Sequence, residues 1–415
     1  MRIKLVTFAP HPNYGTCLQS YALNKVLKDM GHDVEFIYNG RENSRGFLFY
    51  VKKKVKSFLP SKMVGFINKR RQRGNVGEIE SPPHILSLPD SHFRYVLSIL
   101  PFYEPIYRIL KCRTLQWKKV YAFAFEDGNY KMRRLYIKKH YDEVVADADL
   151  FITGSDQIWN PYCGGFNPMM FLEFAGDKKR VAYSSSISRP CFPKEVKDRA
   201  KKDLLKFQHI AVREQSSVDM LNKLLGRDDV QLVVDPTYLL TREEWARFAD
   251  RATIEIDIPE KYIFCYFIGD RYEDYCEMVK KVKKQTGIQD VITMNCTTNN
   301  YNVGGDIFYK DGGPYEFVYL LSHASYVCLD SFHGTLFSLF FEKDFVHILK
   351  YKDESQVDSQ NTRIYDMFSR YGILHKIYND KNLEWLSPID FKRICQIMEK
   401  EKVASMHYLK TAILC

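Results

Sequence analysis

Short apolar segments that alternate with helical patterns constrain the fold of this chain more than any other feature. Helical patterns at 193–207 and 216–225 separate apolar segments that are too short to be helices. These apolar segments are 149–153, 180–184, 210–212 and 230–234. A strand that is apolar along its whole length needs cover on both faces, and the intervening helices can provide it. The alternation therefore predicts a parallel sheet between two layers of helices.

The first forty residues show the same pattern. An apolar strand at 4–8 leads through a turn-forming loop at 10–14 into a helix at 17–30, and a second strand follows at 34–38. Gly31 stands where the C-terminal cap of the helix belongs, because glycine readily adopts the left-handed conformation that ends many helices. We therefore predict that the chain opens with a β-α-β unit.

A break in the pattern separates two series of elements. Asp235 and Pro236 interrupt it, and Thr241 with Glu244 forms the capping box of a new helix. The second series comprises strands at 262–268, 291–294, 326–329 and 345–349, and helices at 272–286, 314–324 and 334–341. A chain of 415 residues also exceeds the size at which one hydrophobic core keeps growing. Two α/β domains are therefore expected.

These breaks predict the domain bounds. Residues 1–237 form an N-terminal α/β domain with a basic, helical insertion at about 45–141, and residues 238–385 form a C-terminal α/β domain. An amphipathic helix over 386–415 begins at Ser387 and Pro388. Two doubly wound, Rossmann-like domains with a C-terminal helix that packs back across them indicate a glycosyltransferase-B-like architecture. Ligands of such folds bind at the carboxyl ends of the strands.

The positive charge is concentrated in one segment. Residues 45–77 contain ten basic side chains and no acidic one, which equals the net charge of +10 for the whole chain. Interleaved phenylalanine, leucine and methionine make the segment amphipathic, which favours contact with an anionic membrane surface. Nucleic acid is a weaker alternative because no recognition motif accompanies the charge. A solvated surface insertion explains the segment equally well.

Several classes of protein are disfavoured by what the sequence lacks. No uncharged apolar run approaches 18 residues, so we expect a cytoplasmic protein without a membrane-spanning helix. The ten cysteines form no C-x-x-C pair and show no metal-ligand spacing, so reduced thiols and no metal site are expected. The motifs of an ordinary ATPase, dehydrogenase, zinc hydrolase or serine hydrolase are also missing.

One histidine lies at the junction of a short strand and a helix. The segment 327–337 predicts a buried strand that runs directly into a helix, with His333 at the turn. Backbone N–H groups and the helix dipole stabilise an anion at such a turn. Asp330 or Ser331 can cap the helix, and Gly334 permits close approach. A histidine there can exchange a proton near neutral pH, although a buried histidine satisfied by hydrogen bonds is the alternative.

Two further clusters follow predicted strands. Gly154 comes directly after an apolar strand, and we expect the polar side chains that follow it, Asp156 and Gln157, to face a cleft. Arg213 at another strand end can bind a phosphate or carboxylate with two hydrogen bonds, but a structural ion pair with Glu214 would also explain it.

Two loops complete the set of candidates. Asn13, Tyr14 and Gln19 belong to the loop and helix after the first strand, where a structural turn is the alternative to a binding role. Arg363 stands in a polar loop before a helix at 364–371.

In their order and spacing, these clusters make the chain resemble the polysaccharide pyruvyl transferase family over about residues 3 to 375. The motifs that carry the resemblance are Asn13-Tyr14-Gly15 with Gln19, Gly154-Ser155-Asp156-Gln157-Ile158-Trp159, Tyr183-Ser184-Ser185-Ser186, Arg213-Glu214, Asp235-Pro236-Thr237, Gly313-Pro314 with Phe317, and Asp330-Ser331-Phe332-His333-Gly334. The resemblance implies a two-domain, glycosyltransferase-B-like enzyme. Such enzymes move the enolpyruvyl unit of phosphoenolpyruvate onto two hydroxyls of a lipid-linked or growing polysaccharide sugar, as a cyclic ketal.

The resemblance also implies roles for individual residues. His333 would be the acid that protonates the methylene carbon, or would stabilise the departing phosphate, and Asp156 would accept a hydroxyl proton or orient the acceptor. The C-terminal domain would bind the donor. The donor-binding residues would be Arg213, Ser331, Phe332, Gly334 and Arg363, and the acceptor-binding residues Asn13, Tyr14, Gln19, Gln157 and Trp159. No metal ion or other cofactor is implied.

One residue departs from the family pattern. Several members carry an arginine two positions before the histidine, where this chain has Ser331. A serine can still hydrogen bond to an anion but supplies no charge, so donor binding would weaken unless another cation compensates. We hypothesise that Arg363 supplies this charge.

Two other functions stay open at the level of sequence. A nucleotide-sugar-dependent glycosyltransferase of the same fold would use a different donor. A non-catalytic scaffold would use the basic segment at 45–77 to hold a biosynthetic complex on the inner face of the membrane. The leading prediction is the pyruvyl transferase, placed in the cytoplasm and peripheral on the membrane through the same segment.

Overall fold

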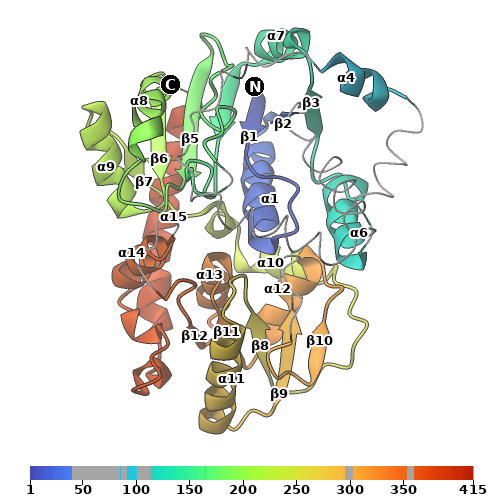
Figure 1. Ribbon diagram of the computed structural model, residues 1–415, viewed down its shortest axis with the longest axis vertical. Coiled ribbons are helices and arrows are strands. Elements are labelled where there is room, and N and C mark those ends of the chain that lie inside the picture. Colours follow the sequence, from blue (N-terminus) through green and yellow to red (C-terminus); the bar gives the residue numbers. More distant parts are fainter. Residues whose placement is uncertain are drawn as a thin grey trace, which may run out of the picture.

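The computed structural model describes residues 1–39, 85, 91–100, 112, 114–163, 165–294, 302–352 and 359–414. These residues form two α/β domains, one above the other in Figure 1. The predicted basic segment at 45–77 lies outside the described residues. No helix among the described residues is both long enough and apolar enough to span a bilayer.

The N-terminal domain contains a seven-stranded sheet in the order β3-β2-β1-β4-β5-β6-β7. Every neighbouring pair of strands is parallel. The strands are β1 Arg2–Val6, β2 Asp33–Asn39, β3 Met132–Leu135, β4 Leu150–Thr153, β5 Lys179–Ser185, β6 His209–Val212 and β7 Gln231–Leu232. The helices are α1 Tyr14–Asp29, α4 His92–Ser98, α6 Leu115–Tyr121, α7 Lys138–Asp147, α8 Lys194–Leu204 and α9 Gln215–Leu225, with a π-helical turn η2 at Ala122–Glu126.

Neighbouring residues of these strands serve different cores. In β1, Leu5 packs into the core that faces the other domain, whereas Val6 packs into a second core on the opposite face. Successive side chains of a strand point to opposite faces, so a strand covered on both sides must be apolar throughout. The prediction of a parallel sheet between two layers of helices is confirmed.

The predicted helical insertion is wrong at one point. Residues 132–135 form β3, which pairs with β2 at the edge of the sheet. Two of its four residues are arginines, and only Leu135 is fully buried. An edge strand covered on one side needs few apolar residues, and its sequence therefore carries little strand signal.

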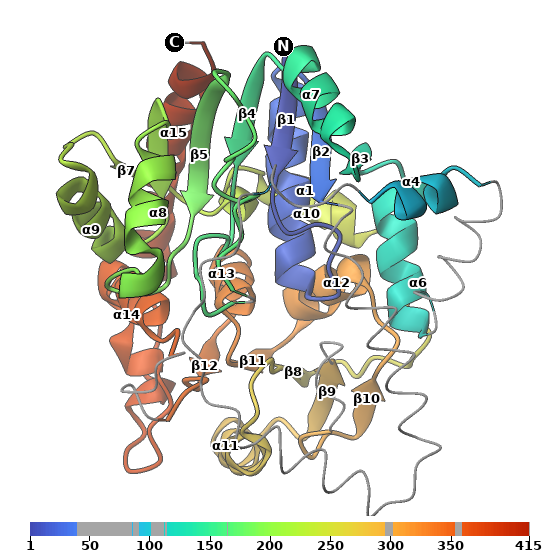
Figure 2. The same cartoon turned by 45° about the horizontal axis from the view of Figure 1, so that its top comes forward.

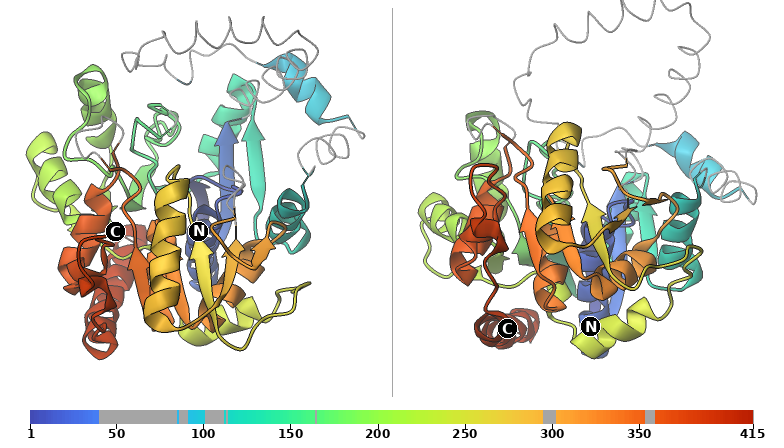
Figure 3. Two further views of the ribbon diagram at one scale, coloured as in Figure 1. Left: turned by 60° about the horizontal axis from the view of Figure 1, so that its bottom comes forward. Right: turned by 90° about the horizontal axis from the view of Figure 1, so that it is seen from below.

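The C-terminal domain contains a five-stranded parallel sheet in the order β10-β9-β8-β11-β12. The strands are β8 Tyr262–Tyr266, β9 Asp290–Met294, β10 Ile307–Tyr309, β11 Tyr326–Leu329 and β12 Phe345–His347. The helices are α11 Tyr272–Thr286, α12 Pro314–His323, α13 Phe332–Phe340 and α14 Thr362–Tyr371. Figure 3 shows α11 across one face of this sheet, where Met278 and Val282 join the core.

The two domains share one hydrophobic core. Residues of α1, α12 and α13 belong to it together with α10 Arg242–Ala249, and Figure 1 shows α10, α12 and α13 in the middle of the molecule. Tyr14 of α1 crosses the boundary: its hydroxyl donates to Gly312 O at 2.9 Å, and its ring stacks on Phe317 with centroids 5.3 Å apart. The predicted capping box of Thr241 and Glu244 is present at the start of α10.

The last helix returns to the first domain. α15 Phe391–Leu414 starts beside the C-terminal domain and ends near the top of the N-terminal domain in Figure 1. Ser405 Oγ accepts the Val234 N–H at 2.9 Å, and Tyr408 donates to Ala182 O at 2.8 Å. Two parallel-sheet domains joined by a returning helix confirm the predicted glycosyltransferase-B-like architecture.

The predicted start of this helix is wrong. The helix begins at Phe391, and Asp390 caps it by accepting the Arg393 N–H at 3.0 Å. Ser387 and Pro388 lie in the connection before it. An aspartate cap satisfies the free N–H groups of the first turn as well as a serine cap does.

Candidate functional site

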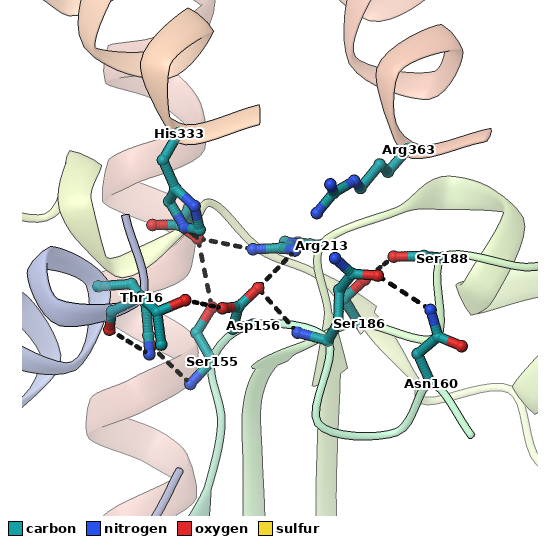
Figure 4. Close-up of polar contacts among 12 residues, drawn as sticks. Thr16, Ser155, Asp156, Asn160, Ser186, Ser188, Arg213, His333 and Arg363 are labelled. Atoms are coloured by element: carbon teal, nitrogen blue, oxygen red, sulfur yellow. Dashed lines mark hydrogen bonds and ion pairs between the residues drawn. The ribbon is translucent and has the colours of Figure 1, made fainter. Parts of the chain in front are cut away.

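Polar side chains from both domains meet where strands of the N-terminal sheet end. Asp156 follows β4, Arg213 follows β6, and Asp235 follows β7. His333 reaches them from the first turn of α13, and Arg363 from the first turn of α14 (Figure 4). The carboxyl ends of parallel strands and the N-termini of two helices therefore border the same space, which is where open α/β sheets bind ligands.

Arg213 holds three carboxylates together. Its Nη2 lies 3.2 Å from Asp156 Oδ1, its Nε 3.1 Å from Glu214 Oε1 and its Nη1 3.0 Å from Asp235 Oδ2. The Arg213 side chain is only 1% exposed, and its guanidinium stacks on the ring of Phe332 at 4.3 Å. Three of its five N–H groups thus bind carboxylates. Arg213 therefore holds these acidic side chains close to one another.

The charges of the cluster set the ionisation of its carboxyls. Burial opposes ionisation of Asp156, but Arg213, His333 and Arg363 outweigh it and lower its pKa. Burial likewise opposes ionisation of Asp235, yet His333 and Arg213 hold its pKa well below the ordinary range. Burial prevails only at Glu214 and raises the pKa of that carboxyl. Asp156 and Asp235 are therefore the ionised carboxyls of the cluster.

His333 lies between Asp235 and the first helix. Its Nε2 is 3.3 Å from Asp235 Oδ2, but this nitrogen is buried and makes no hydrogen bond with any residue that the structure describes. On its other side the imidazole packs on Gly15, where an added Cβ would lie 2.4 Å from Nδ1. Asp235 accepts the Thr237 N–H at 3.1 Å, which fixes its carboxylate. The imidazole therefore has one buried carboxylate, that of Asp235, within ion-pair distance of Nε2.

The backbone around Asp156 has an uncommon conformation. Asp156, Ser184 and Ser188 have φ values of 74°, 54° and 55°, which non-glycine residues rarely adopt. Gly154 has a φ of 122°, and a Cβ there would meet Tyr183 O at 2.0 Å, so only glycine fits. Such residues cluster at functional sites because surrounding contacts hold them against their preference.

Among the described residues, Arg363 is the cation of this site that has no carboxylate partner. Its Nη2 approaches Gln360 Oε1 at 3.5 Å, its Cζ lies 5.5 Å from the ring centre of Phe332, and its buried Nε makes no hydrogen bond. Arg363 makes no ion pair within the described part of the chain, and Figure 4 shows it reaching toward Arg213. Burial and Arg213 lower the pKa of this guanidinium. The sequence placed it in a loop, but the structure places it in the first turn of α14.

The other predicted donor residues surround His333. Ser331 is the N-cap of α13 and accepts the Gly334 N–H at 3.2 Å. The guanidinium groups of Arg213 and Arg363 both lie over the ring of Phe332, at 4.3 and 5.5 Å from its centre. Asp330 does not cap the helix: it accepts the N–H groups of Ile268 and Gly269, each at 2.7 Å.

Three of the predicted acceptor residues hold loops near the cluster. Asn13 caps α1 by accepting the Thr16 N–H at 3.4 Å, and Thr16 Oγ1 donates to Asp156 Oδ2 at 2.8 Å. Gln19 Oε1 accepts the Ser155 N–H at 3.2 Å. Gln157 Nε2 donates to Gln360 Oε1 at 3.1 Å, which joins the two domains beside Arg363.

The other two predicted acceptor residues are buried in packing. Trp159 is 1% exposed, donates its indole N–H to Met170 O and stacks on Phe171. Tyr14 is fully buried at the domain boundary. Both side chains are thus placed to support the fold around the site.

Several residues of the site had no role assigned from sequence. Glu214 and Asp235 were part of sequence motifs, but only their pairing with Arg213 in space shows that they belong to one cluster. Ser186 donates to Glu214 Oε1 at 2.6 Å. Gly15 and Thr16 touch His333 and Asp156, yet in sequence they resemble an ordinary helix start.

A family model described as polysaccharide pyruvyl transferase matches residues 13–353 of this chain. No curated protein matches the sequence. Similar solved structures include UDP-GlcNAc 2-epimerase from Neisseria meningitidis bound to UDP-GlcNAc, with 10% identity, 99% and 94% coverage of this and that chain, and a TM-score of 0.46. The glycosyltransferase SnogD from Streptomyces nogalater has 12% identity, 99% coverage of each chain and a TM-score of 0.43.

Proposed function

Because the chain belongs to the polysaccharide pyruvyl transferase family, we propose that it moves the enolpyruvyl unit of phosphoenolpyruvate onto two hydroxyls of a sugar. The sugar belongs to a polysaccharide or its lipid-linked precursor, and phosphate is released. One observation carries the choice of donor. The buried Nε of Arg363 has no hydrogen-bond partner among the described residues. Buried donors are rarely left unpaired, so an anionic ligand is the expected partner.

The donor suits this arrangement of charges. Phosphoenolpyruvate carries a phosphate and a carboxylate, and a guanidinium binds either with charge-assisted hydrogen bonds. Arg363 faces the cluster without a carboxylate partner among the described residues, whereas Arg213 already holds Asp156, Glu214 and Asp235. We therefore assign the main donor contact to Arg363. Arg213 organises the carboxylates and contributes its remaining N–H groups.

The chemistry needs one acid and one base. His333 Nε2 protonates the methylene carbon of phosphoenolpyruvate, and a sugar hydroxyl attacks the cationic carbon that results, giving its proton to Asp156. The C–O bond to phosphate then breaks, and the second hydroxyl attacks the carbon to close the ketal. One hydroxyl proton replaces the proton that His333 donated, and the other leaves on phosphate. Asp235, 3.3 Å from His333 Nε2, stabilises the protonated imidazole.

The alternative donor, a nucleotide sugar, has less support in the C-terminal domain. In a doubly wound domain a phosphate would bind at the crevice between β8 and β11, where the strand order reverses. Asp330 lies in this crevice and accepts the N–H groups of Ile268 and Gly269, and the Tyr275 hydroxyl also donates to it. These groups are therefore already satisfied by the protein.

Thermal unfolding with added ligand tests the donor. Phosphoenolpyruvate at about 100 times its Kd should stabilise the native protein by about 2.7 kcal/mol, because only the native state binds it. The Arg363→Ala variant should show little or no shift. Arg370→Ala is the matched control: it removes a guanidinium from the same helix, but one that pairs with Glu401 at 3.4 Å. It should keep the shift of the unmodified protein.

Three outcomes would redirect the proposal. A shift with UDP-sugars and none with phosphoenolpyruvate would make the protein a glycosyltransferase. An equal phosphoenolpyruvate shift in Arg363→Ala would remove Arg363 from the donor site. If His333→Ala leaves the function in the cell intact, the protein is a scaffold.

Docking of residues 45–77 on the inner face of the membrane is a separate proposal. Deletion of 45–77 should abolish salt-sensitive sedimentation with anionic vesicles.

A further inference from the structure

The start of α14, which carries Arg363, is held to the N-terminal domain by polar contacts. Figure 2 shows α14 below α8 and α9 of that domain. The position of the Arg363 side chain therefore depends on both domains. The contacts across the boundary are Ser216 Oγ with Asp366 Oδ2 at 2.5 Å, Arg189 Nη1 with Ser359 O at 3.2 Å, and Gln157 Nε2 with Gln360 Oε1 at 3.1 Å.

A chain of buried amides leads from the loop after β4 to Arg363. The Tyr162 N–H donates to Asn160 Oδ1 at 3.0 Å, and Asn160 Nδ2 donates to Gln157 Oε1 at 2.9 Å. Gln157 Nε2 then donates to Gln360 Oε1, the oxygen that Arg363 Nη2 approaches at 3.5 Å. Asn160, Gln157 and Gln360 are no more than 9% exposed, so water has little access to these hydrogen bonds.

The backbone fixes the direction of this amide chain. A backbone N–H can only donate, so the atom of Asn160 that faces it must be the oxygen. The nitrogen of Asn160 then faces Gln157, whose oxygen must accept and whose nitrogen must donate. The atom of Gln360 at the end of the chain is therefore an oxygen. A guanidinium is attracted by an amide oxygen and repelled by an amide N–H, so the direction of the chain matters for Arg363.

The Arg363 guanidinium depends on this oxygen for its direction. Within the described part of the chain, Gln360 Oε1 is the hydrogen-bond acceptor that it approaches, and its buried Nε has no partner there. A long side chain loses rotamer freedom when it binds a ligand, and an acceptor that fixes it beforehand reduces that loss. Gln360 Oε1 can do this from one side of the guanidinium, while Nε–H is left for an anion.

We propose that Gln157 is a positioning residue for the donor: through Gln360 it holds the Arg363 guanidinium in the orientation that binds the anion. The inference rests on the proposed function, in which Arg363 makes the main contact with phosphoenolpyruvate. It places Gln157 on the donor side of the reaction, whereas the family resemblance placed it among the acceptor-binding residues. Because Gln157 belongs to the N-terminal domain and Arg363 to the other, donor binding then depends on the contact between the domains.

A double-mutant cycle tests whether Gln157 acts through Arg363. Gln157→Met keeps the length of the side chain and removes its hydrogen bonds. The apparent affinity for phosphoenolpyruvate, from thermal-shift titration of the full-length protein, should fall about 2- to 10-fold. In the Arg363→Ala protein, titrated at higher concentrations to match its weaker binding, Gln157→Met should change the affinity less than about twofold, since the guanidinium that it positions is gone.

Gln116→Met is the matched control for the loss of a buried glutamine. Gln116 is 5% exposed and donates to the Tyr14 hydroxyl, and its helix α6 lies across the molecule from α14 in Figure 1. This variant should lose stability but keep the phosphoenolpyruvate affinity of the unmodified protein. Gln360→Met interrupts the amide chain next to Arg363 and should reproduce the loss of affinity, which provides a second test if Gln157→Met does not fold.

The same cycle without ligand allows the two proposals to fail separately. The change in unfolding temperature of the double variant should differ from the sum of the two single changes, because both substitutions disrupt one chain of contacts. A phosphoenolpyruvate shift with unchanged affinity in Gln157→Met, or an equal loss with and without Arg363, would overturn the positioning role and leave the donor intact.

Absence of any phosphoenolpyruvate shift in the unmodified protein would overturn the donor instead. The cycle without ligand then decides on Gln157. Additive changes in unfolding temperature would overturn its hold on Arg363 as well, whereas non-additive changes would support it for another anionic ligand.

Discussion

The imidazole of His333 rests on the backbone of Gly15. A Cβ built on Gly15 would lie 2.4 Å from His333 Nδ1 and 2.5 Å from His333 Cβ. Gly15 belongs to α1 of the N-terminal domain and His333 to α13 of the C-terminal domain. The proposed acid is therefore positioned by contact between the two domains, and the absence of a side chain at residue 15 allows that contact.

Gly15→Ala should disable the site more than it destabilises the fold. Carbon atoms in contact prefer about 3.5 to 4 Å, so the two helices must separate by about 1 Å. A misplacement of that size can lower a rate about 100-fold, whereas overpacking costs about 1–3 kcal/mol of stability. Phosphate release from phosphoenolpyruvate with acceptor, compared with the urea midpoint, checks this. Full activity in the variant would show that the contact is not needed.

Asp235→Asn should change the pH dependence of the reaction. Asp235 is ionised because His333 and Arg213 hold its pKa low against the effect of burial, and its charge favours the protonated imidazole. The amide keeps an oxygen for the Thr237 N–H but loses the charge. An acid must be protonated to act, so the alkaline decline of kcat should move to lower pH in the variant. An unchanged alkaline limb, at any level of activity, would rule out this coupling.

The fold was predictable because its pattern repeats and each element carries its own signal. Helix α11 spans Tyr272–Thr286, the range that its apolar spacing predicts. The strands that the sequence missed, β3 and β10, have four and three residues and lie at the edges of their sheets. An edge strand buries few of its side chains and therefore needs few apolar residues. Its sequence then resembles that of a loop.

The site was predictable only in part. His333, Asp156 and Arg213 could be found because each follows a strand, and strand ends of a parallel sheet converge. Which charges pair could not be found, since Asp156 lies 57 residues from Arg213 and Asp235 lies 22 residues from it. Exposure could not be predicted either: Trp159 follows a strand as Asp156 does, but its indole turns into the core.

The buried His347 should make stability depend on pH. Burial, with a smaller effect of Arg363, lowers the pKa of His347 from 6.5 to about 3. Its Nδ1 lies 2.9 Å from Thr335 Oγ1. In the unfolded chain His347 binds a proton as the pH falls below 6.5. In the native protein it does so only at about pH 3. This contribution is therefore complete above pH 6.5 and is lost as pH falls, by at most about 1.4 kcal/mol per pH unit.

His347→Asn isolates that contribution from those of other groups. Asparagine cannot titrate in this range, and its side chain can keep a polar atom near Thr335. Urea midpoints at pH 7 and pH 5 should differ less in the variant than in the unmodified protein. Equal differences in the two proteins would mean that His347 does not carry the effect.

Ser331→Arg should restore donor binding to a protein that lacks Arg363. Ser331 precedes Phe332 in the chain, and the Arg363 guanidinium lies 5.5 Å from the centre of the Phe332 ring. A hydrogen bond to a charged group contributes about 1.5–3 kcal/mol, so Arg363→Ala should weaken the apparent affinity for phosphoenolpyruvate about 10- to 100-fold. Adding Ser331→Arg should recover most of this loss, because a guanidinium at residue 331 again faces the cluster.

The capping role of Ser331 calls for a matched control. Ser331 Oγ accepts the Gly334 N–H at the start of α13, and loss of such a cap costs about 1 kcal/mol. Ser331→Gln removes the cap without adding a charge, so it should lower stability as Ser331→Arg does but should not recover binding in the Arg363→Ala protein. Recovery by glutamine would mean that the charge is not what restores the donor. An unchanged affinity in Arg363→Ala alone would show that Arg363 does not replace the arginine missing at residue 331.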